Sequence, residues 1–219
     1  MSDARARRAI ADTVRWLMAR GLYAGTSGNV SARTATGRML ITPSGVPCDD
    51  VDAASIVPVS FEGTPPARIT RGRFAPSTEW RLHGDIYRRR PEIGAVVHTH
   101  SMFATALSCL RRPIPAFHYM VAKAGGDDIR CARYATYGTA ALSRNALAAL
   151  TGGRRACLLA NHGLVALGAD LASARLLAEE IEALCAQYIH ARTAGTPVVL
   201  PAREMKRVRA KFATYGSPR

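Results

Sequence analysis

The stretch Val96-Val97-His98-Thr99-His100-Ser101 carries two histidines, one residue apart, at the end of an apolar run. Its apolar residues predict a buried strand, in which residues two apart point to the same side of a sheet. We therefore expect His98 and His100 to direct their imidazoles towards one point. A third imidazole, that of His162, lies downstream in the turn Asn161-His162-Gly163-Leu164 and would complete a three-nitrogen site.

Three histidine ligands with a fourth position left open are typical of a catalytic zinc site, although such sites also accept manganese or cobalt. The spacing also allows a plainer interpretation, because a pair of histidines two apart is a weak motif. His98 and His100 would then be polar residues near a surface, and His162 a buried histidine bonded to backbone. The residues upstream of the histidines favour the metal site.

Three turns rich in hydroxyl groups, the first two of them with glycine, precede the histidines: Gly25-Thr26-Ser27-Gly28-Asn29, Thr42-Pro43-Ser44-Gly45 and Pro76-Ser77-Thr78-Glu79. Such turns present backbone N–H groups and short donors to anions, and the third also opens an expected helix, capped by Ser77 or Thr78, whose dipole favours negative charge. Together they predict a phosphate site without a lysine. Any one of them alone is better explained as a simple turn or helix cap.

Glu79 is the most informative carboxylate of the chain, because it lies beside the third turn and upstream of the histidines. Next to a carbonyl held by zinc, a carboxylate could take a proton from the neighbouring carbon. The alternative is a glutamate in the first turn of a helix, where the helix dipole favours negative charge.

The 219 residues contain no internal repeat or long linker, so we expect one domain over residues 1–219. Helices and strands mix without strict alternation, which indicates a central sheet flanked by helices. The expected helices cover residues 3–20, 79–90, 102–110, 139–150 and 171–194, and the expected strands cover residues 30–32, 39–42, 56–59, 95–100 and 156–160.

The net charge of +14 invites a comparison with nucleic-acid-binding proteins. Arginines are scattered along the chain, however, and aromatic residues make up only 6 %, so we expect a solvated basic surface that attracts a small anion rather than nucleic acid.

The sequence has neither an apolar stretch of about 20 residues nor a secretory signal pattern, so we expect no membrane association. Five widely spaced cysteines without a CxxC pair predict a reduced, cytoplasmic protein.

The order of these motifs resembles the class II (zinc) aldolases of the aldolase/adducin superfamily, and most closely its L-fuculose-1-phosphate aldolase branch. The resemblance covers nearly the whole chain. Its motifs are Gly28-Asn29-Val30-Ser31, Leu40-Ile41-Thr42-Pro43-Ser44-Gly45, Ser77-Thr78-Glu79-Trp80-Arg81-Leu82-His83, the run from Arg90 to His100, His118-Tyr119-Met120, Tyr134-Ala135-Thr136-Tyr137-Gly138-Thr139, Asn161-His162-Gly163-Leu164 and Lys211-Phe212-Ala213-Thr214-Tyr215-Gly216.

The resemblance implies an α/β, class II aldolase/adducin-like fold with a mostly antiparallel central sheet, and it implies roles for single residues. Zinc would be bound by His98, His100 and His162, with Glu79 as the catalytic acid/base that can approach the metal in the absence of substrate. Tyr119 would act on the aldehyde oxygen from a neighbouring subunit of a homotetramer. The substrate phosphate would be held by Thr26, Asn29, Ser44, Gly45, Ser77 and Thr78, and the aldehyde end would be lined by Tyr137, Phe212 and Tyr215.

The implied reaction is the cleavage of a ketose 1-phosphate, such as L-fuculose 1-phosphate or a related deoxyketose 1-phosphate, to dihydroxyacetone phosphate and an aldehyde. It passes through an enediolate whose negative charge zinc stabilises. A decarboxylase or dehydratase of a phosphorylated sugar derivative could use the same metal site, and a non-catalytic basic binding module is a more remote alternative. Asn161 stands where the fuculose-phosphate aldolases have a histidine, and Lys123 replaces a small residue, so the aldehyde partner stays open.

Overall fold

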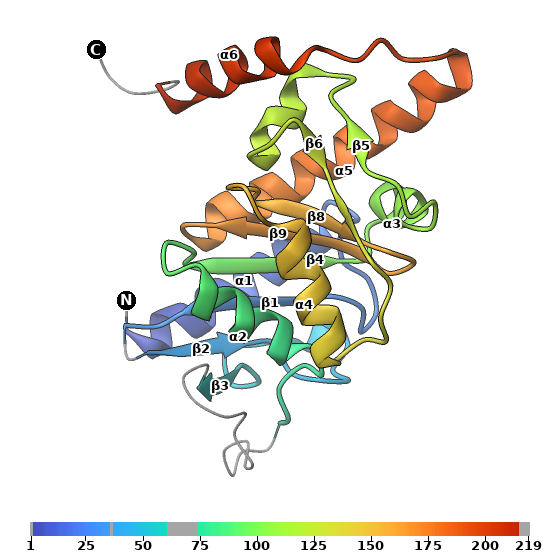
Figure 1. Ribbon diagram of the computed structural model, residues 1–219. Helices are drawn as coiled ribbons and strands as arrows, with labels where there is room; N and C mark the ends of the chain where they lie inside the picture. The colour runs from blue at the N-terminus through green and yellow to red at the C-terminus, as the bar shows by residue number, and fades with distance from the viewer. Residues whose placement is uncertain (1, 36, 61–73, 215–219) are drawn as a thin grey trace.

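The computed structural model describes residues 2–35, 37–60 and 74–214. A seven-stranded sheet lies at its centre in the order β3-β2-β1-β4-β9-β8-β7 (Figure 1). All neighbouring strands of this sheet are antiparallel except β7 and β8, which confirms the expected mostly antiparallel sheet. The strands are β1 Asn29–Arg33, β2 Arg38–Ile41, β3 Val57–Ser60, β4 Ala95–Thr99, β7 Cys131–Ala132, β8 Ala156–Leu159 and β9 Gly163–Gly168.

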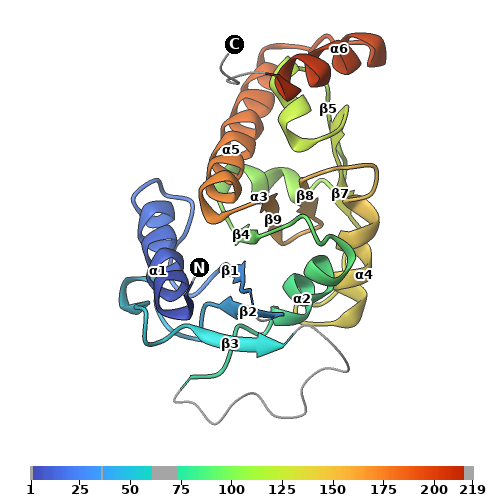
Figure 2. The same cartoon turned by 90° about the vertical axis from the view of Figure 1, so that its left-hand side faces the viewer.

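Helices cover both faces of the sheet, with α1 and α5 on one side and α2 and α4 on the other (Figure 2). The α-helices are α1 Asp3–Met18, α2 Trp80–Arg89, α3 Met102–Ser108, α4 Ala140–Ala149, α5 Leu171–Ala194 and α6 Ala202–Ala213; the 3₁₀ helices are η1 Cys48–Asp50 and η2 Tyr119–Ala124, and a second sheet pairs β5 Ile114–Pro115 with β6 Asp128–Ile129. In the described ranges, no helix combines the length and the apolar character that crossing a membrane requires.

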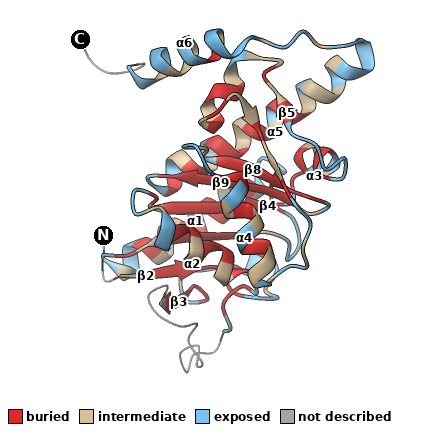
Figure 3. Ribbon diagram, viewed as in Figure 1, coloured by how far each residue is buried: buried red, intermediate tan, exposed pale blue. Residues whose placement is uncertain are grey.

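Two layers of helix explain why the central strands are apolar on both sides. Every residue of β4 is buried, as Figure 3 shows for the middle of the sheet. Along β4, Ala95 and Val97 pack in the core beneath α1 and α5, whereas Val96 packs beneath α2 and α4. Because side chains alternate along a strand, His98 points to the same side as Val96, towards α2.

The start of α2 differs from the expectation. Ser77 or Thr78 was expected to cap this helix, but the helix begins at Trp80 and Glu79 occupies the N-cap position. The Ser77 hydroxyl accepts the backbone N–H of Glu79 at 3.3 Å, and the Ser77 carbonyl accepts that of Trp80 at 3.0 Å. The backbone N–H groups of Glu79 and Trp80 therefore find their acceptors within the turn, on Ser77. The Glu79 carboxylate makes no capping bond, so it is free to face the histidines.

The strand β9 and the helix α6 lie outside the expected set, as do the short elements η1, β5, η2, β6 and β7. Residues 163–168 form the fully buried strand β9, although the sequence pattern was assigned only to a turn there. Residues 202–213, where no helix was expected, form α6, which packs Met205 into the core. The expected long helix of residues 171–194 is confirmed by α5, which has the same bounds.

A capping box starts α5. The Asp170 carboxylate accepts the backbone N–H of Ser173 at 2.7 Å, and the Ser173 hydroxyl accepts that of Asp170 at 3.1 Å. We expect Asp170→Ala to lower the free energy of unfolding by about 1 kcal/mol, because the first turn of the helix loses its acceptor. Urea denaturation measures this change. Asp170→Asn keeps an acceptor and serves as the control; equal stability of wild type and Asp170→Ala would contradict the prediction.

Candidate metal centre

Strand pairing brings three distant histidines to one place. His98 lies near the end of β4, His100 follows that strand, and His162 immediately precedes β9. Because β4 pairs antiparallel with β9, Thr99 lies opposite Leu164, and the end of one strand meets the start of the other. The Nε2 atoms of His98 and His100 are 3.0 Å apart, and the three ring centroids lie 4.8–4.9 Å from one another.

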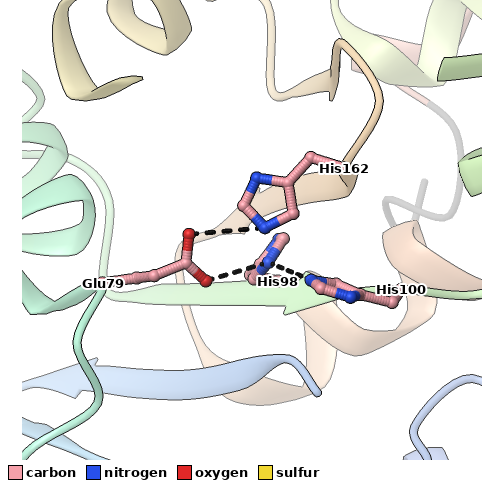
Figure 4. Close-up of side chains that lie close together, drawn as sticks. All are labelled: Glu79, His98, His100 and His162. Atoms are coloured by element: carbon pink, nitrogen blue, oxygen red, sulfur yellow. Dashed lines mark hydrogen bonds and ion pairs between the residues drawn. The ribbon is translucent and has the colours of Figure 1, made fainter. Parts of the chain in front are cut away.

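The Glu79 carboxylate faces this cluster from the start of α2 (Figure 4). Its Oε2 lies 3.1 Å from Nε2 of His98, and its Oε1 lies 3.5 Å from Nε2 of His162. Glu79 is only 5 % exposed, and its Oε1 is buried without a hydrogen-bond partner. A buried carboxylate oxygen without a donor is costly unless a cation or a proton compensates it.

The four side chains fit a divalent metal ion. One ligand atom from each of Glu79, His98, His100 and His162 lies within 4.8 Å of the others. Two nitrogens bound to one tetrahedral zinc lie about 3.3 Å apart, which is close to the 3.0 Å between Nε2 of His98 and Nε2 of His100. The Nδ1–H of His98 donates to the Leu164 carbonyl at 2.8 Å, so the lone pair of Nε2 points into the cluster.

The pKa values of the four side chains shift in different directions. Burial lowers the pKa of His100 and of His162 to about 4, with His98 adding to the effect, so both imidazoles are neutral near pH 7. Burial opposes charge on His98 and Glu79 as well, but their mutual attraction outweighs it. The pKa of His98 is therefore raised, and the pKa of Glu79 lies below its usual range.

The three predicted phosphate turns open onto the same cavity as the cluster. Its volume is about 370 Å³. Of the predicted site residues, those lining it are Thr26, Asn29, Ser44, Gly45, Ser77, Thr78, Glu79, His100, Tyr137 and His162. His98 lies behind them and is fully buried. The predicted phosphate donors therefore line the same cavity as Glu79, His100 and His162.

Gly28 shows why the first turn is tight. Its φ is +97°, and a Cβ there would lie 2.8 Å from the His98 carbonyl and 2.9 Å from the Tyr23 ring. The next residue, Asn29, was predicted to hold phosphate, but its side chain is already engaged: Nδ2 donates to Glu79 Oε2 at 3.0 Å, and Oδ1 contacts His83 Nε2 at 2.5 Å. A role for the Asn29 side chain towards phosphate is left to its one remaining amide proton.

Two of the predicted aromatic residues, Tyr119 and Phe212, lie apart from this cavity. Tyr119, in η2, and Phe212, in α6, stand near each other with ring centroids 6.2 Å apart, and neither lines the cavity of their own chain. The helix α6 lies in the upper part of the molecule in Figure 1, above the sheet. Tyr215 lies outside the described residues. The predicted roles of these three side chains stay predictions.

Several cavity residues were absent from the predicted set. Tyr134 lines the cavity beside Tyr137, and its ring lies 5.6 Å from the Arg111 guanidinium. Arg111 donates at 2.6 Å to Asn161, whose φ of +51° turns the chain into His162. The repeated tyrosines three residues apart were the available signal for Tyr134. No sequence signal linked Arg111 to Asn161, because 50 residues separate them.

Comparisons with known proteins agree with this geometry. Residues 8–189 match the family described as the class II aldolase and adducin N-terminal domain. The chain is 52 % identical over 210 residues to a 5-methylthioribulose-1-phosphate/5-deoxyribulose-1-phosphate aldolase of Rhodospirillum rubrum, covering 96 % of this chain and 92 % of the relative. It is 45 % identical over 210 residues to an L-fuculose phosphate aldolase of Escherichia coli O6:H1, covering 95 % and 94 %.

A solved structure extends the likeness to three dimensions. An L-fuculose 1-phosphate aldolase superposes with a TM-score of 0.90 at 40 % identity, covering 97 % of this chain and 98 % of that one. Class II aldolases use a divalent metal, and the cluster of three histidines and one glutamate is the group that could bind it here. The resemblance inferred from the motifs is confirmed: the chain belongs to the class II aldolase and adducin family, and it is a class II aldolase, a lyase.

Proposed function

We propose that this enzyme is a zinc-dependent aldolase that cleaves a ketose 1-phosphate to dihydroxyacetone phosphate and an aldehyde. One observation carries the proposal: the Glu79 carboxylate faces three converging imidazoles in a cavity whose other wall is built from hydroxyl-rich turns. Zinc is the proposed ion because three imidazole nitrogens and one carboxylate are ligands that it prefers. When bound, it supplies positive charge beside the substrate carbonyl.

The remaining chemistry belongs to the side chains of the protein. The turns around Thr26, Ser44 and Ser77 would hold the phosphate at C1 through N–H and hydroxyl donors. That position sets C3 of the ketose near Glu79. When the C3–C4 bond breaks, its electron pair remains with C3 and the adjacent carbonyl, and Glu79 delivers a proton to C3 to give dihydroxyacetone phosphate. In the reverse direction, Glu79 removes that proton.

Tyr119 is proposed to act on the aldehyde oxygen, where it accepts the proton of the C4 hydroxyl during cleavage. It lies outside the cavity of its own chain, so the proposal places it in the site of a neighbouring subunit of a homotetramer. Phe212 packs near Tyr119 and would reach the same aldehyde end together with Tyr215. The proposed compartment is the cytoplasm, where the five free cysteines would stay reduced.

The substrate assay separates the candidates by their products. With zinc-loaded protein, L-fuculose 1-phosphate would give dihydroxyacetone phosphate and lactaldehyde, whereas 5-deoxyribulose 1-phosphate would give dihydroxyacetone phosphate and acetaldehyde. A coupled dehydrogenase detects the shared product, and mass detection identifies the aldehyde. The names of the relatives support both substrates. Carbon dioxide release would indicate a decarboxylase, and a product that keeps every carbon would indicate a dehydratase. No cleavage of any ketose 1-phosphate would reject the proposal.

Mixed oligomers test the shared site. We expect Tyr119→Phe to lower kcat for cleavage by about 10²-fold, because the aldehyde oxygen loses its acid/base partner. If Tyr119 serves a neighbour, co-refolding Tyr119→Phe chains with inactive Glu79→Gln chains restores part of the activity, since some sites then receive both native residues. Refolding of each variant alone is the control. Activity of the mixture equal to the mean of the two parents would place Tyr119 outside the neighbouring site.

A further inference from the structure

A line of buried polar side chains runs away from the metal centre between α2 and β1. Asn29 Nδ2 lies 3.0 Å from Glu79 Oε2, and Asn29 Oδ1 lies 2.5 Å from His83 Nε2. His83 Nδ1 is 2.7 Å from the Ser31 hydroxyl, which is 2.8 Å from the Tyr87 hydroxyl. His83, Ser31 and Tyr87 are at most 1 % exposed. The end of the line that lies away from the metal centre is therefore inaccessible to solvent.

The spacing of these residues follows from two regular structures lying side by side. Glu79, at the N-cap of α2, is followed at intervals of four residues by His83 and Tyr87 within the helix, so the three side chains lie on one side of it. Asn29 and Ser31 are two residues apart along β1, so they share one face of the strand. Four helical residues advance about 6.0 Å and two strand residues about 6.6 Å, which lets the two rows interdigitate.

The hydrogen bonds have only one consistent direction. A carboxylate only accepts, so Asn29 must turn its amide nitrogen towards Glu79 and its amide oxygen towards His83. That oxygen in turn requires a proton on His83 Nε2. Burial lowers the pKa of His83 to about 3, so the ring is neutral and its Nδ1 accepts from the Ser31 hydroxyl. The Ser31 oxygen then accepts from the Tyr87 hydroxyl, whose pKa burial raises.

We infer that His83 is a positioning residue for the proton transfer assigned to Glu79, because its Nε2–H fixes the Asn29 amide and the amide in turn fixes one carboxylate oxygen. The inference rests on the proposed aldolase function. Oε2 of Glu79 is held by Asn29, whereas Oε1 has no hydrogen bond and stays available to the reacting carbon. Without the donor on His83, the Asn29 amide could rotate, and its oxygen would then repel the carboxylate.

The kinetic test uses zinc-loaded His83→Met, which fills a similar volume without a donor. We expect kcat for cleavage to fall about 10–100-fold, the usual cost of losing a supporting hydrogen bond, with KM and zinc content close to wild type. Exchange of the C3 proton of dihydroxyacetone phosphate with deuterated water, followed by NMR, should slow by the same factor, since this half-reaction needs only Glu79 and no aldehyde. His83→Gln, which keeps an N–H donor, should recover most of the loss.

Leu82→Met, the neighbouring buried position on α2, is the matched control and should retain wild-type exchange. Wild-type exchange in His83→Met would overturn the inference, as would a loss confined to KM. A wild-type enzyme that cleaves no ketose 1-phosphate would instead reject the proposed function.

The second measurement needs no activity and no folded variant. Long-range ¹⁵N–¹H NMR of the histidine-labelled wild-type protein distinguishes the two neutral tautomers of a buried ring. We expect His83 to carry its proton on Nε2, because Asn29 Oδ1 can only accept. A proton on Nδ1 would reverse the hydrogen bonds with Asn29 and Ser31 and would overturn the inference, even if His83→Met failed to fold.

Discussion

Glu79→Gln should lower kcat for ketose 1-phosphate cleavage by about 10³-fold, within the range expected when a catalytic acid/base is removed. The amide keeps the size of the side chain but cannot exchange a proton at C3. The variant should still bind zinc, because His98, His100 and His162 retain their nitrogens. Steady-state kinetics and metal analysis of the same preparation measure both properties.

The control for this substitution lies in the affinity for dihydroxyacetone phosphate. The phosphate turns do not depend on the charge of Glu79, so the affinity should change little. A Glu79→Gln enzyme with kcat near wild type would exclude Glu79 as the acid/base. Loss of zinc together with activity would instead make Glu79 a required ligand, a second way in which the prediction would be wrong.

His98→Ala should abolish both zinc binding and cleavage. His98 is fully buried between Glu79 and His100, and its Nδ1–H is tied to the Leu164 carbonyl. Losing a supporting hydrogen bond already costs a metal site about 10–100-fold in affinity, so losing the ligand itself should cost more than about 100-fold. Competition with a chelator and metal analysis measure the affinity. His190→Ala, on the exposed side of α5, is the matched control and should keep one zinc per chain.

Zinc uptake should depend on pH through His98. The pKa of His98 is raised by Glu79, whereas the pKa values of His100 and His162 are about 4. Below its raised pKa, His98 carries a proton that zinc must displace, so affinity falls as pH decreases and uptake releases about one proton. Above that pKa, the proton is already gone and release declines. Calorimetry in buffers of different ionisation enthalpy counts the protons; release that rises with pH would contradict this assignment.

Patterns within short segments predicted many of the helices and strands of the fold. The apolar run before His98 predicted a buried strand, and the 3.6-residue period of residues 171–194 predicted α5 with its observed bounds. Both rest on periodicity inside one element, which the sequence displays directly. Prediction was poorer where neighbouring groups compete for the same hydrogen bonds. The helix cap expected at Ser77 or Thr78 lies at Glu79, because the Ser77 hydroxyl accepts the backbone N–H of Glu79 within the turn.

The sequence alone determined the residue types of the site: three imidazoles, one carboxylate and hydroxyl-rich turns in a recognisable order. Only the tertiary structure decided which of them meet. The antiparallel pairing of β4 with β9 brings His162 to His98, and the packing of α2 on β1 commits Asn29 to Glu79 and His83. Strand register and helix packing depend on contacts between residues 50 or more positions apart, and the periodicity within one segment does not reveal such contacts.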